Sequence, residues 1–404
     1  MAERKKQFVG IGFGPIQSGL FLLEASRSGN FDRLTVADID AAMVQAVRDN
    51  QGRYTVNVAS ATGISQQVIE GVRMLNPQIP EERAELIQAL AVADEIATAL
   101  PSIKFFSHGG EAAPAACLAA GLRQRSAAAP PAIIYTAENH NHAAEILQAA
   151  ITEQLSGKSF PDNVQILNTV IGKMSGVITE AAEQRRLGIA QLTPGSDRAV
   201  LVEEFNRILI SRIALPGFTR GITVFGEKAD LLPFEEAKLY GHNAVHALLG
   251  YLAHGCGCRN MAEAAGNPEL MAKAHEAFLL ESGRGLRFRH GGIDPLFTEA
   301  GFRAYAEDLL ARMTNPYLCD PVARVIRDPQ RKLAWDDRLI GAMRLALQAG
   351  VIPVRFAEGV RAAKHCLKQN KLQEIWTDEV WNSVEAAPIR ALISDDVLSK
   401  STKD

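Results

Sequence analysis

An amine, an amide and an imidazole lie close together in the segment KLYGHNAVH, residues 238–246. The flanking sequence has helical spacing, and on an α-helix Asn243 and His246 would lie about 60° apart on one face. Lys238 would lie about 80° from His246 and roughly 12 Å nearer the N-terminus. Because a lysine side chain can span much of that distance, the three polar groups can line one site.

This trio suits hydride transfer at an alcohol. Oxidation of a secondary alcohol needs a base for the hydroxyl proton, and a buried lysine with a lowered pKa is such a base. Amide and imidazole N–H groups can hold the oxygen as it gains negative charge. The predicted catalytic residues are Lys238, Asn243 and His246, with no metal. From spacing alone, a solvated helix face remains the alternative.

Strands and helices alternate at the N-terminus. Residues 8–11 (FVGI) and 34–39 (LTVADI) are expected to be buried strands, and residues 16–29 between them have helical spacing. Strand, helix and strand of these lengths form a βαβ unit, which implies a parallel sheet covered by helices. Further elements are expected at 41–50 (helix), 132–139 (strand) and 164–172 (strand).

A glycine-rich turn, in GIGFGPIQSG, joins the first strand to its helix. Glycines let backbone N–H groups approach a pyrophosphate, and the helix N-terminus attracts its charge. An acid after the second strand would accept hydrogen bonds from ribose hydroxyls and repel a 2′-phosphate, which favours NAD over NADP. A tight turn with solvated acidic caps is the other interpretation. The predicted cofactor-binding residues are Gly10, Gly12, Gly14, Gln17 (at the third glycine position of G-x-G-x-x-G) and Asp38.

Composition narrows the class of protein. A chain of 404 residues, 47% of them hydrophobic, can bury a large core and is expected to form two domains. The net charge of −3 argues against nucleic acid or an anionic membrane as a partner. Five irregularly spaced cysteines favour a reducing, cytoplasmic setting. The uncharged run from Phe8 to Leu23 is too short and glycine-rich to indicate a membrane span or signal peptide.

The pattern changes near Leu231, after which long helical patterns replace strand-like runs. We therefore predict an α/β protein with an N-terminal Rossmann-type parallel-sheet domain, residues 1–228, and an all-α C-terminal domain, residues 229–404. Two cysteines occur in HGCGC (254–258), but on a helix side chains two apart point in different directions. No zinc site is expected there.

The sequence resembles the polyol-specific long-chain dehydrogenase family. That family carries K-x4-N-x2-H on the first long helix of its C-terminal domain, and the lysine, asparagine and histidine of residues 238–246 match position for position. NPYLCDPVARV (315–325) and PQRKLAWDDR (329–338) resemble two further family stretches. The resemblance covers nearly the whole chain and is strongest at 8–40 and 231–350.

The resemblance implies a metal-independent enzyme that uses NAD. Lys238 would be the general base, and the other two members of the trio would bind the reacting oxygen. Asn139, which follows a predicted strand, would assist at the same oxygen. Arg324 and Lys332 match family positions that contact the far hydroxyls or the phosphate of the substrate.

The residues themselves also indicate an anionic ligand. Segment 324–332, RVIRDPQRK, holds four cations and one acid. A helix is not expected to run through Asp328 into Pro329, so a bent basic loop results, which suits a phosphorylated sugar. Solvated surface is the alternative. Lys173, where relatives carry an acid-rich stretch, either contacts an anionic substrate or reflects divergence.

We predict an NAD-dependent oxidoreductase that interconverts a sugar-alcohol phosphate and a ketose phosphate. One alternative keeps the chemistry but takes an unphosphorylated hexitol or a hexuronate. Another is a non-catalytic NAD-binding regulator, suggested by the altered glycine turn. The expected partner is a small molecule rather than nucleic acid or a membrane, and nothing in the sequence requires an oligomer, so a monomer is expected to suffice.

Overall fold

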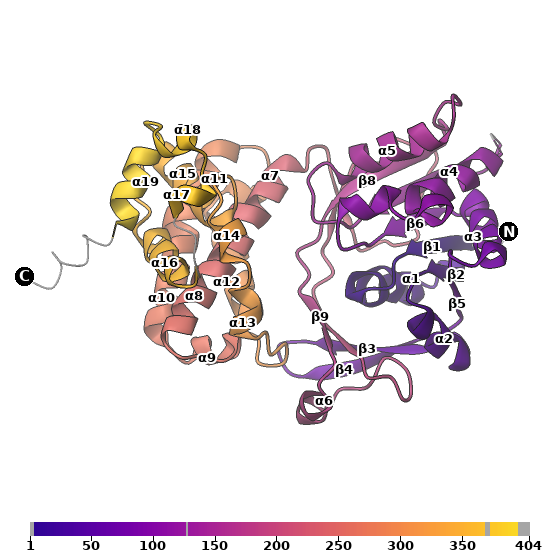
Figure 1. Cartoon of the computed structure of the whole chain (residues 1–404), viewed down its shortest axis with the longest axis horizontal. Helices are drawn as coiled ribbons and strands as arrows, with labels where there is room; N and C mark the ends of the chain where they lie inside the picture. Colours follow the sequence, from indigo (N-terminus) through magenta and orange to yellow (C-terminus); the bar gives the residue numbers. More distant parts are fainter. Residues whose placement is uncertain (1–3, 127, 368–371, 395–404) are drawn as a thin grey trace, which may run out of the picture. The chain divides into compact units, whose positions relative to one another are not determined.

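The computed structural model describes residues 4–126, 128–367 and 372–394. The chain divides into two compact units, Met1–Leu231 and Leu232–Asp404 (Figure 1). The first unit mixes strands and helices, whereas the described part of the second unit contains helices and no named strand. The predicted α/β and all-α parts are confirmed in this order along the chain.

An eight-stranded sheet forms the centre of the first unit. Six neighbouring strands, from β8 to β5, run parallel, and β11 pairs antiparallel with β8. The strand order reverses beside β1, between the β2 side and the β6 side, as in doubly wound nucleotide-binding sheets. In order across the sheet the strands are β12 (Gly226–Lys228), β11 (Leu209–Ser211), β8 (Val164–Val170), β7 (Ala132–Thr136), β6 (Glu95–Thr98), β1 (Lys6–Ile11), β2 (Phe31–Ala37) and β5 (Val72–Leu75).

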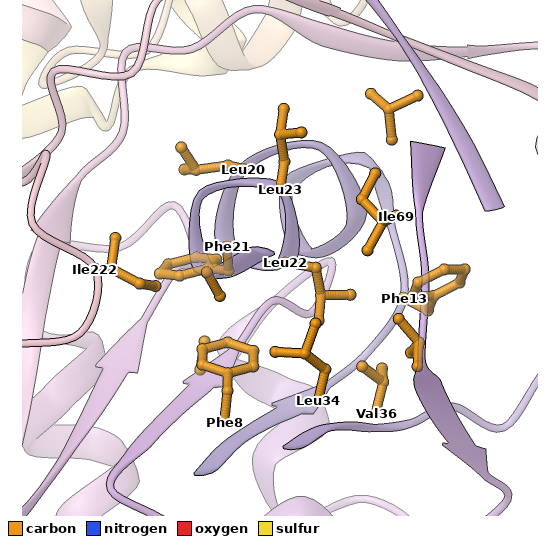
Figure 2. Close-up of a cluster of buried hydrophobic side chains, with 14 of the residues drawn as sticks. Phe8, Phe13, Leu20, Phe21, Leu22, Leu23, Leu34, Val36, Ile69 and Ile222 are labelled. Atoms are coloured by element: carbon orange, nitrogen blue, oxygen red, sulfur yellow. The ribbon is translucent and has the colours of Figure 1, made fainter. Parts of the chain in front are cut away.

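Helices cover both faces of this sheet because successive strand residues point to opposite sides. Phe8 enters one buried cluster, and its neighbour Val9 enters another. Figure 2 shows Phe8 beneath the helical residues Leu20 to Leu23. The helical segments of this unit are η1 (Gln17–Phe21), α1 (Leu22–Ser28), α2 (Ala41–Asp49), α3 (Pro80–Val92), η2 (Ile103–Ser107), η3 (Gly110–Ala112), α4 (Pro114–Gln124), α5 (Ala143–Gln154) and α6 (Ala181–Leu187).

A second, four-stranded sheet in the first unit was not predicted. Its order is β4 (Ile64–Ile69), β3 (Tyr54–Ala59), β10 (Ala199–Glu203) and β9 (Ser175–Ile178). The sheet packs on the first helical segment, where a Cβ atom on Gly19 would come within 2.5 Å of Cγ1 of the fully buried Val202. Gly19 therefore lets η1 lie directly against β10.

The second unit is built from helices that follow the long helical patterns of the sequence. α7, η4 and α8 form one continuous helical run, as do α10, η5 and α11. No described helix is long and apolar enough to cross a membrane. The segments are α7 (Leu232–Glu236), η4 (Ala237–Asn243), α8 (Ala244–Gly255), α9 (Met261–Ala265), α10 (Pro268–Glu276), η5 (Ala277–Ser282), α11 (Gly283–His290), η6 (Pro295–Phe297), α12 (Glu299–Met313), α13 (Val322–Val325), α14 (Pro329–Lys332), α15 (Arg338–Gln348), α16 (Val354–His365), α17 (Leu372–Ile375), α18 (Asp378–Trp381) and α19 (Ala386–Ile393).

The contact between Gly19 and Val202 gives the first prediction. Gly19→Ala should destabilise the protein by about 1–3 kcal/mol, since the added methyl meets a buried side chain that cannot move aside. Val202→Ala in the same chain should recover part of that loss. Gly14→Ala is the control, because nothing lies within 4 Å of its added methyl. Thermal unfolding of the four proteins tests the idea, and equal melting temperatures would contradict it.

Candidate active site

The lysine, asparagine and histidine lie on the helical run of α7, η4 and α8, and its middle part is a π-helix. A π-helix pairs residue i with i+5, and short π segments often occur at functional sites. On a regular α-helix Lys238 and Asn243 would stand about 140° apart around the axis. The π-helix η4 ends at Asn243 and includes Lys238, so the two residues come toward the same side. This corrects the predicted α-helical geometry and brings the pair closer together.

Neighbouring helices support the π segment. The Tyr305 hydroxyl of α12 donates to the Ala237 carbonyl at 3.4 Å. Gly241 lets the Phe278 ring of η5 approach, since a Cβ atom there would lie 3.1 Å from that ring. The conformation that carries the trio is therefore fixed by tertiary contacts.

The amine of Lys238 lies in a setting that favours its neutral form. Burial, together with the charge of Arg338, lowers the pKa of Lys238 to about 8. Lys332, which is 5% exposed, has a pKa lowered to about 8 by burial and by the charges of Arg338 and Arg331. Lys238 is thus poised to exchange a proton near neutral pH, whereas its ordinary pKa would keep it charged.

His246 contacts an acid that the sequence did not single out. Its Nε2 atom lies 3.2 Å from Oδ2 of Asp320, close enough for an ion pair although the angle is too poor for a hydrogen bond. The other oxygen of Asp320 accepts from Nε of Arg324 at 2.6 Å. One carboxylate thus links two predicted site residues. The side-chain amide of Asn243 forms no hydrogen bond with the described residues.

The predicted bend in the basic segment is confirmed. α13 ends at Val325, and Asp328 adopts a left-handed conformation with φ of 57°. Its carboxylate then caps α14 by accepting from the Arg331 N–H at 3.3 Å. The bend leaves the Arg324 side chain 41% exposed and Lys332 almost completely buried. Both stay candidates for substrate binding.

The glycine turn of the first unit is tied to the acid after β2. Gly12 has φ of 85°, and a Cβ atom there would come within 2.7 Å of the Ala99 carbonyl oxygen, so this position requires glycine. The Phe13 N–H donates to Oδ2 of Asp38 at 2.6 Å, and the Asp40 N–H donates to Oδ1 at 2.8 Å. The structure thus brings Asp38 to the turn.

Gln17 has a different place from the one expected. Its side chain is fully buried, and a Cβ atom on Gly10 would collide with it. A glycine at this point of the motif normally lets helix and strand pack closely. Here Gly10 on the strand makes room for the larger helix residue. The burial argues against direct contact between the Gln17 side chain and a cofactor.

The glycine turn and its surroundings have the features that a dinucleotide needs. η1 and α1 form one helical run after the turn, and its N-terminal end offers backbone N–H groups. A Cβ atom on Gly14 would meet no atom within 4 Å, so the chain leaves space beside the turn. With Asp38 at the end of β2, the residues fit a pyrophosphate and a ribose.

Asn139 follows β7 and is exposed, whereas its neighbour in the sequence, Glu138, is a buried acid. Glu138 accepts from the Leu100 N–H at 2.9 Å and from the Thr98 hydroxyl at 2.9 Å. Burial raises the pKa of Glu138 to about 7, against the lowering effect of these hydrogen bonds. Glu138 thus connects the ends of β6 and β7, and it fixes the position of the backbone at the adjacent Asn139.

Lys173 points inward. Its amine donates to the carbonyl oxygens of Glu203 and Phe205, and the residue is 7% exposed. This internal role argues against the predicted contact with an anionic substrate. The sequence around Lys173 gave no indication that this side chain is buried.

Other polar and aromatic features have structural explanations. Among the described residues, no group of three or more His, Cys, Asp or Glu side chains is arranged to hold a metal ion. Trp376 packs between two further tryptophans, Trp335 and Trp381, and donates to the Leu333 carbonyl at 2.9 Å.

Comparison with known proteins identifies the family of this chain. Residues 230–400 match the model of the mannitol dehydrogenase C-terminal domain. The chain is 30% identical over 359 residues to a mannitol-1-phosphate 5-dehydrogenase of Bacillus licheniformis, covering 87% of this chain and 86% of that protein. It is also 30% identical over 362 residues to the enzyme of the same name from Anoxybacillus flavithermus, covering 88% and 86%.

Solved structures agree on the fold. A D-sorbitol dehydrogenase in substrate-free form matches with a TM-score of 0.77 at 11% identity, over 98% of this chain and 94% of that one. The mannitol 2-dehydrogenase of Pseudomonas fluorescens, solved with NAD and D-mannitol, matches with a TM-score of 0.66 at 19% identity, over 98% and 86%. The chain thus belongs to the long-chain polyol dehydrogenase family.

Proposed function

We propose that this protein is an NAD-dependent, metal-independent dehydrogenase that interconverts a sugar-alcohol phosphate and a ketose phosphate. The single observation that carries the proposal is the amine of Lys238, whose pKa burial lowers to about 8 on the same helical run as Asn243 and His246. The names of the two relatives given above, both mannitol-1-phosphate 5-dehydrogenases, support the substrate class.

The chain's residues divide the work of alcohol oxidation. Neutral Lys238 takes the hydroxyl proton, and the side-chain N–H of Asn243 holds the oxygen as it becomes a carbonyl, with the imidazole ring of His246 beside it. NAD, when bound, supplies the acceptor for the hydride that leaves the carbon. In the reverse direction, protonated Lys238 returns the proton to the oxygen.

The charge of the second unit supports an anionic substrate. Arg324, Lys332 and Arg338 are cations on neighbouring short segments, and Lys332 and Arg338 are mostly buried. Asp320 and Asp337 each pair with one arginine, which leaves the buried Lys332 as excess positive charge. A phosphate would stabilise that charge, whereas a neutral hexitol would not. The comparisons favour an enzyme over the regulator considered from the sequence.

The first test of the mechanism is the pH dependence. A base must be neutral, so kcat/KM for oxidation should rise with pH and level off above about 8, and the rate of reduction should fall above the same value. Lys238→Met should lower kcat by about 10²–10⁴-fold and remove this limb. Lys332→Met is the matched control, since its pKa is also about 8 but its expected effect is on KM. Unchanged turnover in Lys238→Met would refute the mechanism.

The second test concerns the phosphate. Arg324→Glu should raise KM for mannitol 1-phosphate at least about tenfold, because a charge-assisted pair becomes a repulsion. KM for free mannitol and the affinity for NADH should change little. Arg303→Glu makes the same change on an exposed side chain of α12, outside the basic segment, and should act like the wild type. If free mannitol or fructuronate is turned over better than the phosphate, the alternative substrate classes are correct.

The third test concerns the cofactor. The wild type should bind NADH at least about tenfold more tightly than NADPH, because the Asp38 carboxylate repels a 2′-phosphate. Asp38→Asn should narrow this ratio, whereas Asp32→Asn, at the opposite end of β2, should leave it unchanged. Fluorescence titration with both nucleotides measures the ratio. Equal affinity of the wild type for both would contradict the assignment of Asp38.

A further inference from the structure

Asp320 is a buried acid for which the chemistry described above has no use. Its side chain is 4% exposed, and it lies in the turn between α12 and α13 rather than on the helix that carries the trio. A carboxylate placed there without partners would be costly. Its described side-chain partners are His246, through one oxygen, and Arg324, through the other.

The backbone around Asp320 holds it rigidly. The Met261 N–H donates to the Asp320 carbonyl at 2.9 Å, and the Val322 N–H donates to the Arg259 carbonyl at 3.0 Å. Asn260 and Pro321 form an isolated antiparallel bridge between these two contacts. These contacts pair residues 259–261 with residues 320–322, a pairing called the clasp below. They fix the position of the Asp320 side chain relative to α8.

The clasp is reached through a strained turn. Cys319, directly before the acid, has φ of 47°, a conformation that non-glycine residues adopt at a cost of about 1–3 kcal/mol. Such strain persists only where surrounding contacts fix the chain. Here it turns the chain so that the next side chain enters the protein.

The charge of Asp320 is also settled by its partners. Burial raises the pKa of Asp320, but the contacts with His246 and Arg324 outweigh this effect and bring the pKa to about 2. The group is therefore an anion throughout the physiological range. An anion facing Nε2 of His246 favours the imidazole with its proton on that nitrogen and fixes the ring plane. Its bond to Nε of Arg324 fixes the plane of the guanidinium in the same way.

We propose that Asp320 is a positioning residue that sets, with one carboxylate, both the His246 ring at the reacting oxygen and the Arg324 guanidinium at the far end of the substrate. The inference rests on the proposed function of those two residues. Because the same anion contacts both side chains, it fixes the His246 ring and the Arg324 guanidinium relative to each other, and with them the two ends of the substrate. A small error in these positions slows the reaction more than it weakens binding.

Steady-state kinetics of the full-length protein, with mannitol 1-phosphate and NAD, tests the proposal. Asp320→Asn should lower kcat by about 10- to 100-fold, by analogy with the loss of a partner behind a metal-bound histidine, and should raise KM by less. Asp320→Glu should recover part of kcat. Asp308→Asn, the control, removes an exposed acid of α12 that pairs with Arg312 at the same spacing and should retain full activity. A kcat for Asp320→Asn within twofold of the wild type would overturn the proposal.

A second measurement needs no variant at Asp320. Two-bond ¹H–¹⁵N spectra of the wild type, assigned with His246→Gln, should show the His246 proton on Nε2 in the neutral ring. A proton on Nδ1, or rapid mixing of both forms, would overturn the proposal even if Asp320→Asn fails to fold. Loss of activity in His246→Gln together with normal activity in Asp320→Asn would leave the proposed function standing and reject this inference. A wild type inactive on every polyol would reject the proposed function, and the tautomer would still decide the role of Asp320.

Discussion

The shielding of one lysine amine from water is the constraint on which the rest of the candidate active site depends. In water an amine with a pKa near 10.4 is charged at neutral pH and cannot accept a proton. Burial in the second unit, with Arg338 nearby, brings the pKa of Lys238 to about 8, a difference worth roughly 3 kcal/mol between the two protonation states. The helix bundle provides that environment through large apolar residues. Phe278 and Phe302 are each at most 1% exposed and belong to the helices packed beside η4.

The π-helix is the second requirement, because it places functional groups where an α-helix would separate them. The extra residue per turn leaves backbone groups poorly paired, so such a turn survives only with outside support. Tyr305 supplies a hydroxyl to the Ala237 carbonyl, and Gly241 allows close packing by Phe278. The bundle therefore has two effects on Lys238: it lowers the pKa of the amine, and it supports the π-helical backbone that brings Lys238 and Asn243 toward the same side of the helix.

Sequence reasoning found what local pattern encodes and missed what tertiary contacts decide. Alternation of apolar residues located the first βαβ unit, and the spacing of Lys238, Asn243 and His246 marked the helix. The π register has no local signal, since it depends on a hydrogen bond from Tyr305, 68 residues beyond Ala237. The second sheet was missed because β4 reads ISQQVI, in which half of the residues are polar. Gln17 was predicted to bind the cofactor and Lys173 to bind an anionic substrate, but no local pattern reveals that both side chains are buried. Asp320 lies within the motif NPYLCDPVARV, but only the contacts in the structure reveal that its side chain lies beside His246.

The cations around Lys238 have two effects that must be balanced. Arg338 lowers the pKa of both Lys238 and Lys332, and the same positive field attracts a phosphate. A bound dianion beside Lys238 would cancel that field and raise the amine's pKa again, which would weaken it as a base for the same substrate at neutral pH. The phosphate is therefore best held away from the base, at the Arg324–Lys332 segment, with Asp320 standing between that segment and His246. Under the proposed function, an acid at this point would keep Arg324 from acting on the reacting oxygen. Positive charge would then serve substrate binding at one end, and desolvation of Lys238 would serve catalysis at the other.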